Sequence, residues 1–334
     1  MMTNHNAFYQ FCSAVRRKGV LALCLTLCTL GLGLGTRAHE SGPSIIAFDA
    51  PGADTVTTYP MDINPTGTIV GWSMDASNVW HGFLRAPSGA ITTVDAPGAG
   101  TGAWQGTAAY SINPAGTVVG NYNDASGVSH GFLRAPDGRF KTLDAPGAGT
   151  SNGQGTIAWS INPAGAIVGT STDASGVSHV FLRTPDGRFT KLDAPGAGTS
   201  NGQGTGAPSI NPAGMIAGYY VDASNVWHGF VRAPDGRFKT LDAPGAGSGA
   251  GQGTDAQSIN PAGTIAGYYV DASGVYHGFL RDPHGQITTI DAPDAGSGAG
   301  QGTGAWGMSI NPAGAITGTY IDASGVFHGF LRTP

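Results

Sequence analysis

Six histidines recur at nearly constant spacing in this chain, and each follows an aspartate by six residues. The histidines are His81, His130, His179, His228, His277 and His328. The aspartates before them are Asp75, Asp124, Asp173, Asp222, Asp271 and Asp322. Histidine and carboxylate side chains perform general acid–base catalysis and, where they converge, bind metal ions. The pattern is therefore a candidate for a catalytic or metal site.

The spacing favours a structural role for these residues. Because every repeat carries the same pair, the six histidines are expected to form a wide ring and not to converge on one ion. An aspartate that begins a turn commonly caps it through its own backbone. One carboxylate per turn also supplies too few oxygens for calcium. We therefore expect hydrogen-bonded structural histidines, and neither a metal nor a cofactor.

Positions that differ between the repeats are better candidates for a site that occurs once. None of the six tryptophans occupies a position kept in every repeat. In the fifth repeat, Asp255 and Gln257 lie two residues apart on the strand expected to line a central channel, so they share one face of it. The variable residue before each histidine is often aromatic. The candidate binding residues are Trp72, Trp80, Trp104, Trp159, Trp227, Tyr276, Trp306, Phe327, Asp255 and Gln257.

Two interpretations of these aromatic residues stay open. They could fill uneven gaps between repeats, or they could form a face that stacks on sugar rings, with polar side chains as partners. Catalysis has less support, because Glu40 is the only glutamate and Asp255 is the only carboxylate at a channel position. No serine nucleophile elbow, phosphate loop or metal triad is present. We expect no catalytic residues, and a lyase or hydrolase of unrecognised type remains the alternative.

The elements that would position these residues follow from the repeat. The tripeptide Ile-Asn-Pro recurs with intervals of 49, 49, 49, 49 and 51 residues. Between residues 107 and 147, turn sequences such as Asn-Pro-Ala-Gly and Ala-Pro-Asp-Gly separate short apolar segments. Four strands joined by tight turns in about fifty residues are typical of a propeller blade. The sequence therefore predicts an all-β fold, a six-bladed β-propeller of four-stranded antiparallel blades.

The repeats are out of phase with the two ends of the chain. Residues 44–52 resemble the end of a repeat, and residues 303–332 form a repeat that lacks its last quarter. The two pieces together make one unit. We therefore predict a closed ring in which 44–52 supply the fourth strand of the last blade.

The first forty residues have a different composition from the rest. Three basic residues at 16–18 precede an apolar run, and Thr36-Arg37-Ala38 ends it with small residues, as in a secretory signal peptide. We predict a signal peptide at 1–38 and a single propeller domain at 39–334, either extracellular or periplasmic. All 3 cysteines lie in the removed segment, so no disulfide is expected.

The predicted mature chain is acidic. It keeps 12 of the 16 basic residues and all 21 acidic residues, a formal charge of −9. This excludes a basic surface for nucleic acid, and no membrane insertion is expected after signal cleavage. A monomer is expected.

The repeat unit resembles that of the bacterial extracellular HAF family. The resemblance rests on His-Gly-Phe-Leu, which follows a glycine-containing turn, and on Asp-Ala-Pro-Gly downstream. Glycine stands here where that family has the alanine of its His-Ala-Phe core. The resemblance covers the whole predicted mature chain and implies a secreted β-rich repeat protein. It implies no activity. From the variable aromatic residues we predict a non-catalytic binding or interaction module, for a glycan or a cell-surface protein; a structural or protein-interaction scaffold is the alternative.

Overall fold

The computed structural model describes residues 48–51 and 57–334, and every regular element among them is a β-strand. The chain divides into two units, Met1–Asp49 and Ala50–Pro334. The fold described below is that of the second unit. The predicted signal peptide, 1–38, lies outside the described residues.

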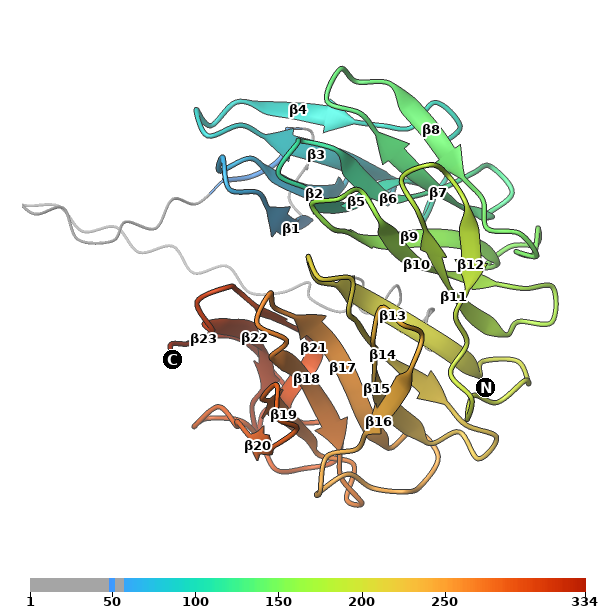
Figure 1. The fold of residues 1–334 in the computed structure, drawn as a ribbon. Helices are drawn as coiled ribbons and strands as arrows, with labels where there is room; N and C mark the ends of the chain where they lie inside the picture. The colour runs from blue at the N-terminus through green and yellow to red at the C-terminus, as the bar shows by residue number, and fades with distance from the viewer. Residues whose placement is uncertain (1–47, 52–56) are drawn as a thin grey trace, which may run out of the picture. The chain divides into compact units, whose positions relative to one another are not determined.

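Within the described residues, 23 strands fall into six consecutive groups, one for each repeat (Figure 1). The first three groups are β1 (Thr57–Ile63), β2 (Ile69–Met74), β3 (Trp80–Arg85), β4 (Ile91–Val94); β5 (Gly106–Ile112), β6 (Val118–Asn123), β7 (Ser129–Arg134), β8 (Phe140–Leu143); β9 (Gly155–Ile161), β10 (Ile167–Thr172), β11 (Ser178–Arg183), β12 (Phe189–Lys191). The last three are β13 (Gly204–Ile210), β14 (Ile216–Val221), β15 (Trp227–Arg232), β16 (Phe238–Leu241); β17 (Gly253–Ile259), β18 (Ile265–Val270), β19 (Tyr276–Arg281), β20 (Ile287–Thr289); β21 (Gly302–Ile310), β22 (Ile316–Ile321), β23 (Phe327–Arg332). The prediction of an all-β fold built from repeated antiparallel blades is confirmed.

Each blade is an up-and-down sheet held by short turns. In the second blade, β5 pairs with β6, β6 with β7 and β7 with β8, all antiparallel. The side chain of Asn113 accepts a hydrogen bond from the Thr117 N–H, and Gly116 takes the positive φ of 83° that the turn needs. Asp124 closes the next turn by accepting from the N–H groups of Ser126 and Val128. The predicted turns are therefore present.

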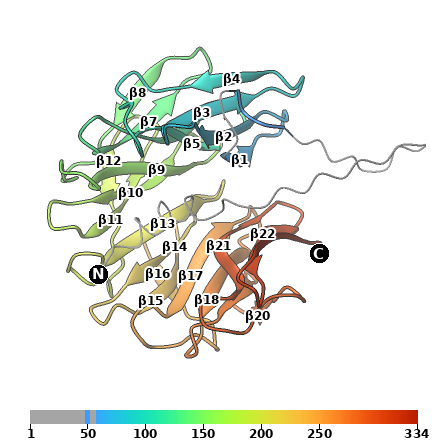
Figure 2. The same ribbon diagram turned by 180° about the vertical axis from the view of Figure 1, so that it is seen from behind.

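Figures 1 and 2 show that the first strand of each blade lies innermost and the fourth outermost. The long connection after each fourth strand returns the chain to the centre. The Gln154 side chain in one of these connections donates to the Ala174 carbonyl in an Asp-Ala-Ser turn, and Gly153 donates to the Gly127 carbonyl in another. Long connections and Asp-Ala-Ser turns thus share one face.

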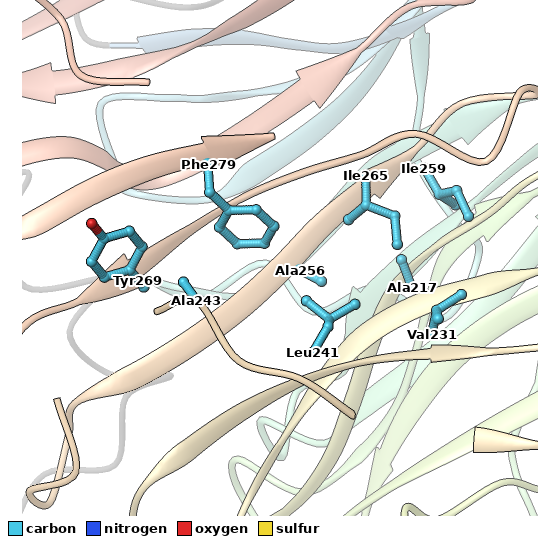
Figure 3. Close-up of a cluster of buried hydrophobic side chains, with 9 residues drawn as sticks. All are labelled: Ala217, Val231, Leu241, Ala243, Ala256, Ile259, Ile265, Tyr269 and Phe279. Atoms are coloured by element: carbon cyan, nitrogen blue, oxygen red, sulfur yellow. The ribbon is translucent and has the colours of Figure 1, made fainter. Parts of the chain in front are cut away.

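Apolar side chains fill the space between neighbouring blades. Figure 3 shows one such core, between the fourth and fifth blades. Its members are Ala217, Val231, Leu241, Ala243, Ala256, Ile259, Ile265, Tyr269 and Phe279. The phenylalanine and Ile265 are fully buried, and each such side chain contributes about 1.5–3 kcal/mol by leaving water. Stacking of blades is therefore the main source of stability.

A backbone contact joins each blade to the next at five junctions. The residue before the histidine forms a parallel bridge with the glycine that begins the following blade, as between Ser129 and Gly155. That glycine has a φ of 115°, and a Cβ there would overlap the backbone oxygen of Ser129. Only glycine fits this close approach. The same bridge links Trp80 to Gly106, Ser178 to Gly204, Trp227 to Gly253 and Tyr276 to Gly302.

The last blade has three described strands, and one side of it is uncovered. Leu331 on β23 is 71% exposed, whereas its counterpart Val231 is 7% exposed. The predicted closing segment, 44–52, falls mostly outside the described residues, and its described part, 48–51, contains no strand. The structure shows the repeated blades, and closure of the ring stays a prediction.

Candidate functional site

The repeat-wide histidines connect two parts of their own blade. His130 lies with Nδ1 3.0 Å from Asp144 Oδ1 and Nε2 3.4 Å from Asp124 Oδ2, and the ring of Tyr122 stacks on it. The hairpin of β7 and β8 brings Asp144 to the histidine. Burial lowers the pKa of His81, but hydrogen bonds and charge from Asp95 and Asp75 outweigh it, so the pKa is raised. Each of these histidines is hydrogen-bonded within its own blade, as predicted.

The variable aromatic residues form three separate groups. In the first blade, Trp72 packs between Tyr59 and Trp80, with ring centroids 4.3 and 5.9 Å away. Trp72 and Trp80 are 6% and 2% exposed, so they fill space inside the protein. Between the second and third blades, Tyr110 packs on Trp159 at 4.7 Å. Neither of these two groups contains an ionisable carboxyl or amino group.

Three of the predicted residues lie outside these pairs and clusters. Trp104 belongs to a long connection, where its φ is 66° and its backbone contacts Asn78 and Asn123. Phe327 is half-buried at the start of β23. The Trp306 side chain lies outside the described part of the structure. The nine candidates with described side chains therefore do not converge on a single surface.

The third group joins aromatic residues to a carboxylate at the fourth and fifth blades. We call it the Asp255 cluster, and it consists of Tyr219, Trp227, Asp255, Gln257, Tyr268 and Tyr276. Tyr219 stacks on Trp227 at 5.6 Å, Trp227 meets the edge of Tyr268 at 6.3 Å, and Tyr268 lies 5.7 Å from Tyr276. Asp255 on β17 is the strand neighbour of Tyr268 on β18.

The Asp255 carboxyl is buried, with 2% of the residue exposed. Within the described structure, its Oδ1 atom has no hydrogen-bond partner. Burial raises the pKa of Asp255 to about 7, although hydrogen bonding from Gln257 and Tyr268 opposes the rise. The same burial and the charge of Asp255 raise the pKa of Tyr268. Among the described residues, no positive group contributes to the pKa shift of Asp255, so Gln257 and Tyr268 are the partners that favour its charged form.

The sequence predicted Asp255, Gln257, Trp227 and Tyr276 and missed Tyr219 and Tyr268. The signal was available, because the equivalent second-strand position also varies between repeats. It reads Trp72, Asn121, Thr170, Tyr219, Tyr268 and Thr319. Comparing second strands as well as first and third strands would have found both tyrosines.

The cluster reaches the surface through its half-buried members. Tyr219, Trp227, Tyr276 and Gln257 each keep part of their surface in solvent, while Asp255 and Tyr268 lie beneath them. Two surface hollows, of about 320 and 410 Å³, lie elsewhere and include no member of the cluster. Flat rings above a carboxylate and an amide can stack on a ligand and accept hydrogen bonds from it. We therefore prefer the cluster to the hollows as the candidate site.

The described residues include no group of three or more histidine, cysteine, aspartate or glutamate residues placed to hold a metal ion. No helix long and apolar enough to cross a membrane occurs in the part of the chain that the structure describes.

The chain is similar in fold to several solved structures. No family model matches it, and no curated protein sequence does. A prolyl endopeptidase aligns with a TM-score of 0.52 and 12% identity, over 83% of this chain and 41% of its own. The BP39L lectin from Burkholderia pseudomallei aligns with a TM-score of 0.49 and 12% identity, over 80% of this chain and 78% of its own. The Aleuria aurantia lectin, described as a six-bladed β-propeller that recognises fucose, has a TM-score of 0.45 and 12% identity and covers 81% of this chain and 89% of its own.

These similarities concern the fold alone. The chain spans 41% of the prolyl endopeptidase and 54% of a puromycin hydrolase that is also similar. One fold can serve binding as well as catalysis, so the fold alone does not assign a function. Function has to be argued from the residues of this chain.

Proposed function

We propose that this protein is a non-catalytic binding module that recognises glycans through the Asp255 cluster. The observation that carries the proposal is the contact among four variable aromatic side chains in one cluster with Asp255 and Gln257. Sugars present apolar faces that stack on aromatic rings, and their hydroxyl groups donate to carboxylate and amide oxygens. The half-buried rings and the Gln257 amide offer both kinds of partner where the cluster reaches the surface, and the Asp255 carboxylate is buried behind this surface.

Absence of a second carboxylate in the cluster supports binding over hydrolysis. Glycoside hydrolysis ordinarily uses two carboxyl groups that flank the scissile bond. Among the described residues that act on the pKa of Asp255, none is another acid. The cluster is therefore better suited to hold a ligand than to cleave it.

The closure of the ring, the export of the protein and its class of repeat are also part of the proposal. We infer a closed six-bladed β-propeller in which residues 44–52 complete the last blade, exported by the signal peptide at 1–38. The His-Gly-Phe-Leu and Asp-Ala-Pro-Gly segments support placement with the secreted HAF-type repeat proteins. The acidic charge, with 21 acidic residues against 16 basic ones in the full chain, supports a ligand other than nucleic acid.

A tryptophan fluorescence titration tests the proposal. The mature protein is titrated with a panel of purified glycans, and an emission change is expected with at least one of them. Trp227 is the only tryptophan of the cluster, so Trp227→Phe should remove most of the change. Trp159→Phe, which alters a ring pair outside the cluster, should keep it. No response across the panel contradicts the proposed function.

A further inference from the structure

The Asp255 carboxylate lacks the partner that a buried charge ordinarily has. Its Oδ1 atom has no hydrogen bond within the described structure, and the residue is 2% exposed. Buried carboxylates are normally paired with a cation or hydrogen-bonded at both oxygens, because an isolated buried charge is costly. The first four repeats do not place a charge here: the equivalent residues are Tyr59, Ala108, Ile157 and Gly206. Packing between blades therefore does not require the carboxylate.

The side chains around this oxygen have the chemistry that stabilises a cation. Tyr268 is the strand neighbour of Asp255, and burial and the charge of Asp255 raise the pKa of Tyr219. Trp227 and Tyr276 pack on these two tyrosines, which places four electron-rich rings in one cluster with the carboxyl. A cation over such a face is attracted by the ring quadrupole, most strongly by tryptophan. The charges of Lys and Arg side chains make no contribution to the pKa of Asp255. A negative group within an aromatic cluster is thus left to pair with a charge from outside the chain.

We propose that the Asp255 cluster selects glycans that carry a protonated amine, as the amino sugars of a de-N-acetylated polysaccharide do. The inference rests on the proposed glycan-binding function and names the ligand class for the same site. The ammonium group donates to Asp255 Oδ1, and the sugar ring stacks on Trp227 and Tyr276. A neutral N-acetylated sugar offers the stacking face without the charge.

The raised pKa of Asp255, to about 7, agrees with this assignment. A bound ammonium next to the carboxylate favours its ionised form. Binding therefore lowers the pKa of Asp255, and the group that is partly protonated in the free protein becomes fully ionised in the complex.

The test compares two oligosaccharides that differ only at the amine. Glucosamine oligomers and N-acetylglucosamine oligomers of equal length are titrated at neutral pH into the full mature protein, with tryptophan fluorescence and calorimetry as readouts. Charge-assisted hydrogen bonds are worth about 10- to 100-fold in affinity. We expect the glucosamine oligomer to bind wild type more tightly by that factor. Asp255→Asn should remove the preference and retain the weaker binding of the N-acetylated oligomer.

A matched control separates the site from general attraction between an acidic protein and a cationic sugar. Asp137, an exposed turn aspartate that pairs with Arg139, lies outside the cluster, and Asp137→Asn should keep the full preference. Equal loss in both variants, or equal affinity of wild type for the two oligomers, overturns the amine assignment and leaves glycan binding intact. Failure of either oligomer and of the whole glycan panel to change the fluorescence overturns the proposed function itself. Because the oligomer comparison uses wild type, the assignment is testable even if Asp255→Asn unfolds.

Discussion

Five junctions between neighbouring blades are built alike, and the side of the last blade that would meet the first is different. At the internal junctions a side chain of one blade reaches the backbone of the next. Ser111 accepts from the Ile161 N–H at 3.4 Å, and Asn211 donates to the Asn260 carbonyl at 3.2 Å. In the last blade the equivalents, Ser309 and Asn311, are exposed. The internal junctions are therefore joined by hydrogen bonds from one blade to the next. Within the described residues, the side chains of Ser309 and Asn311 make no such bond to another blade.

The first blade shows the same difference from its own side. At the internal junctions, the isoleucine N–H at the end of a first strand can donate to a side chain of the preceding blade. Ile63 instead donates to its own neighbour Asp62, at 2.8 Å, and is 60% exposed. The connection before it is shorter as well. Ala50 N–H donates to Thr58 eight residues on, whereas Ala96 donates to Thr107 eleven residues on. The repeat specifies the internal junctions, and the entry segment must specify the last one separately.

Deleting residues 44–52 should reduce stability more than any substitution at the junctions. If the segment closes the ring, its loss leaves the edge of β23 unpaired and keeps Leu331, Ile63 and the neighbouring blade face in water. Several large apolar side chains at about 1.5–3 kcal/mol each predict a loss of unfolding free energy on the order of 6 kcal/mol.

Thermal and denaturant unfolding measure the effect of this deletion. A second deletion, of residues 39–43, lies outside the predicted strand and should leave the stability of the mature protein unchanged. Equal melting temperatures for the 44–52 deletion and the full mature chain would mean that the segment does not close the ring.

The Asp255 cluster makes the stability of the later blades depend on pH. The pKa of Asp255 is raised by burial from 3.8 to about 7, so the folded state holds this proton more tightly than the unfolded chain. The free energy of unfolding therefore falls as the pH rises from about 4 to about 7, by up to about 4 kcal/mol. Asp255→Asn cannot ionise and should lack this fall. Denaturant unfolding at several pH values checks it, and parallel curves for the two proteins would contradict it.

The glycine bridges distinguish the internal junctions from the last one by substitution. Gly155→Ala adds a Cβ at a φ of 115° against the Ser129 backbone oxygen, so the two blades must separate. We expect a loss of about 3 kcal/mol in denaturant unfolding. The first repeat has Thr57 at this place, and Thr57→Ala should change stability by less than about 1 kcal/mol. A loss below about 1 kcal/mol for Gly155→Ala would show that this bridge tolerates a Cβ.

The sequence predicts what depends on one repeat and misses what depends on two. Asn113, Gly116 and Asp124 indicate turns through local chemistry, and the structure has turns there. The pairing of His130 with Asp144 was also accessible, because the antiparallel register of β7 and β8 places them together. The approach of Trp227 to Tyr268 could not be predicted from the sequence, because it depends on how one blade rotates against the next.

The sixth repeat shows a further limit of local reasoning. Its two extra residues disturb the register of β21 between Thr303 and Met308. An insertion of this kind changes which residues face the neighbouring blade, and nothing in the sequence of the other repeats specifies how the strand accommodates it. Spacing alone therefore identified the variable positions and did not say which of them meet.

The smallest expected effect tests the last junction through one charged pair. In the second blade, Asp144 follows the fourth strand directly and bonds His130 across a partly exposed surface, with side-chain exposures of 52% and 24%. Asp144→Asn should therefore cost only about 0.5 kcal/mol. In the last blade His328 contacts Asp322, and Asp49 stands in the sequence where a fourth strand from residues 44–52 would bring the second aspartate. If the segment closes the ring, Asp49→Asn should cost as much as Asp144→Asn in denaturant unfolding. A loss seen for Asp144→Asn alone would show that Asp49 does not reach His328, because the two sites would otherwise be equivalent.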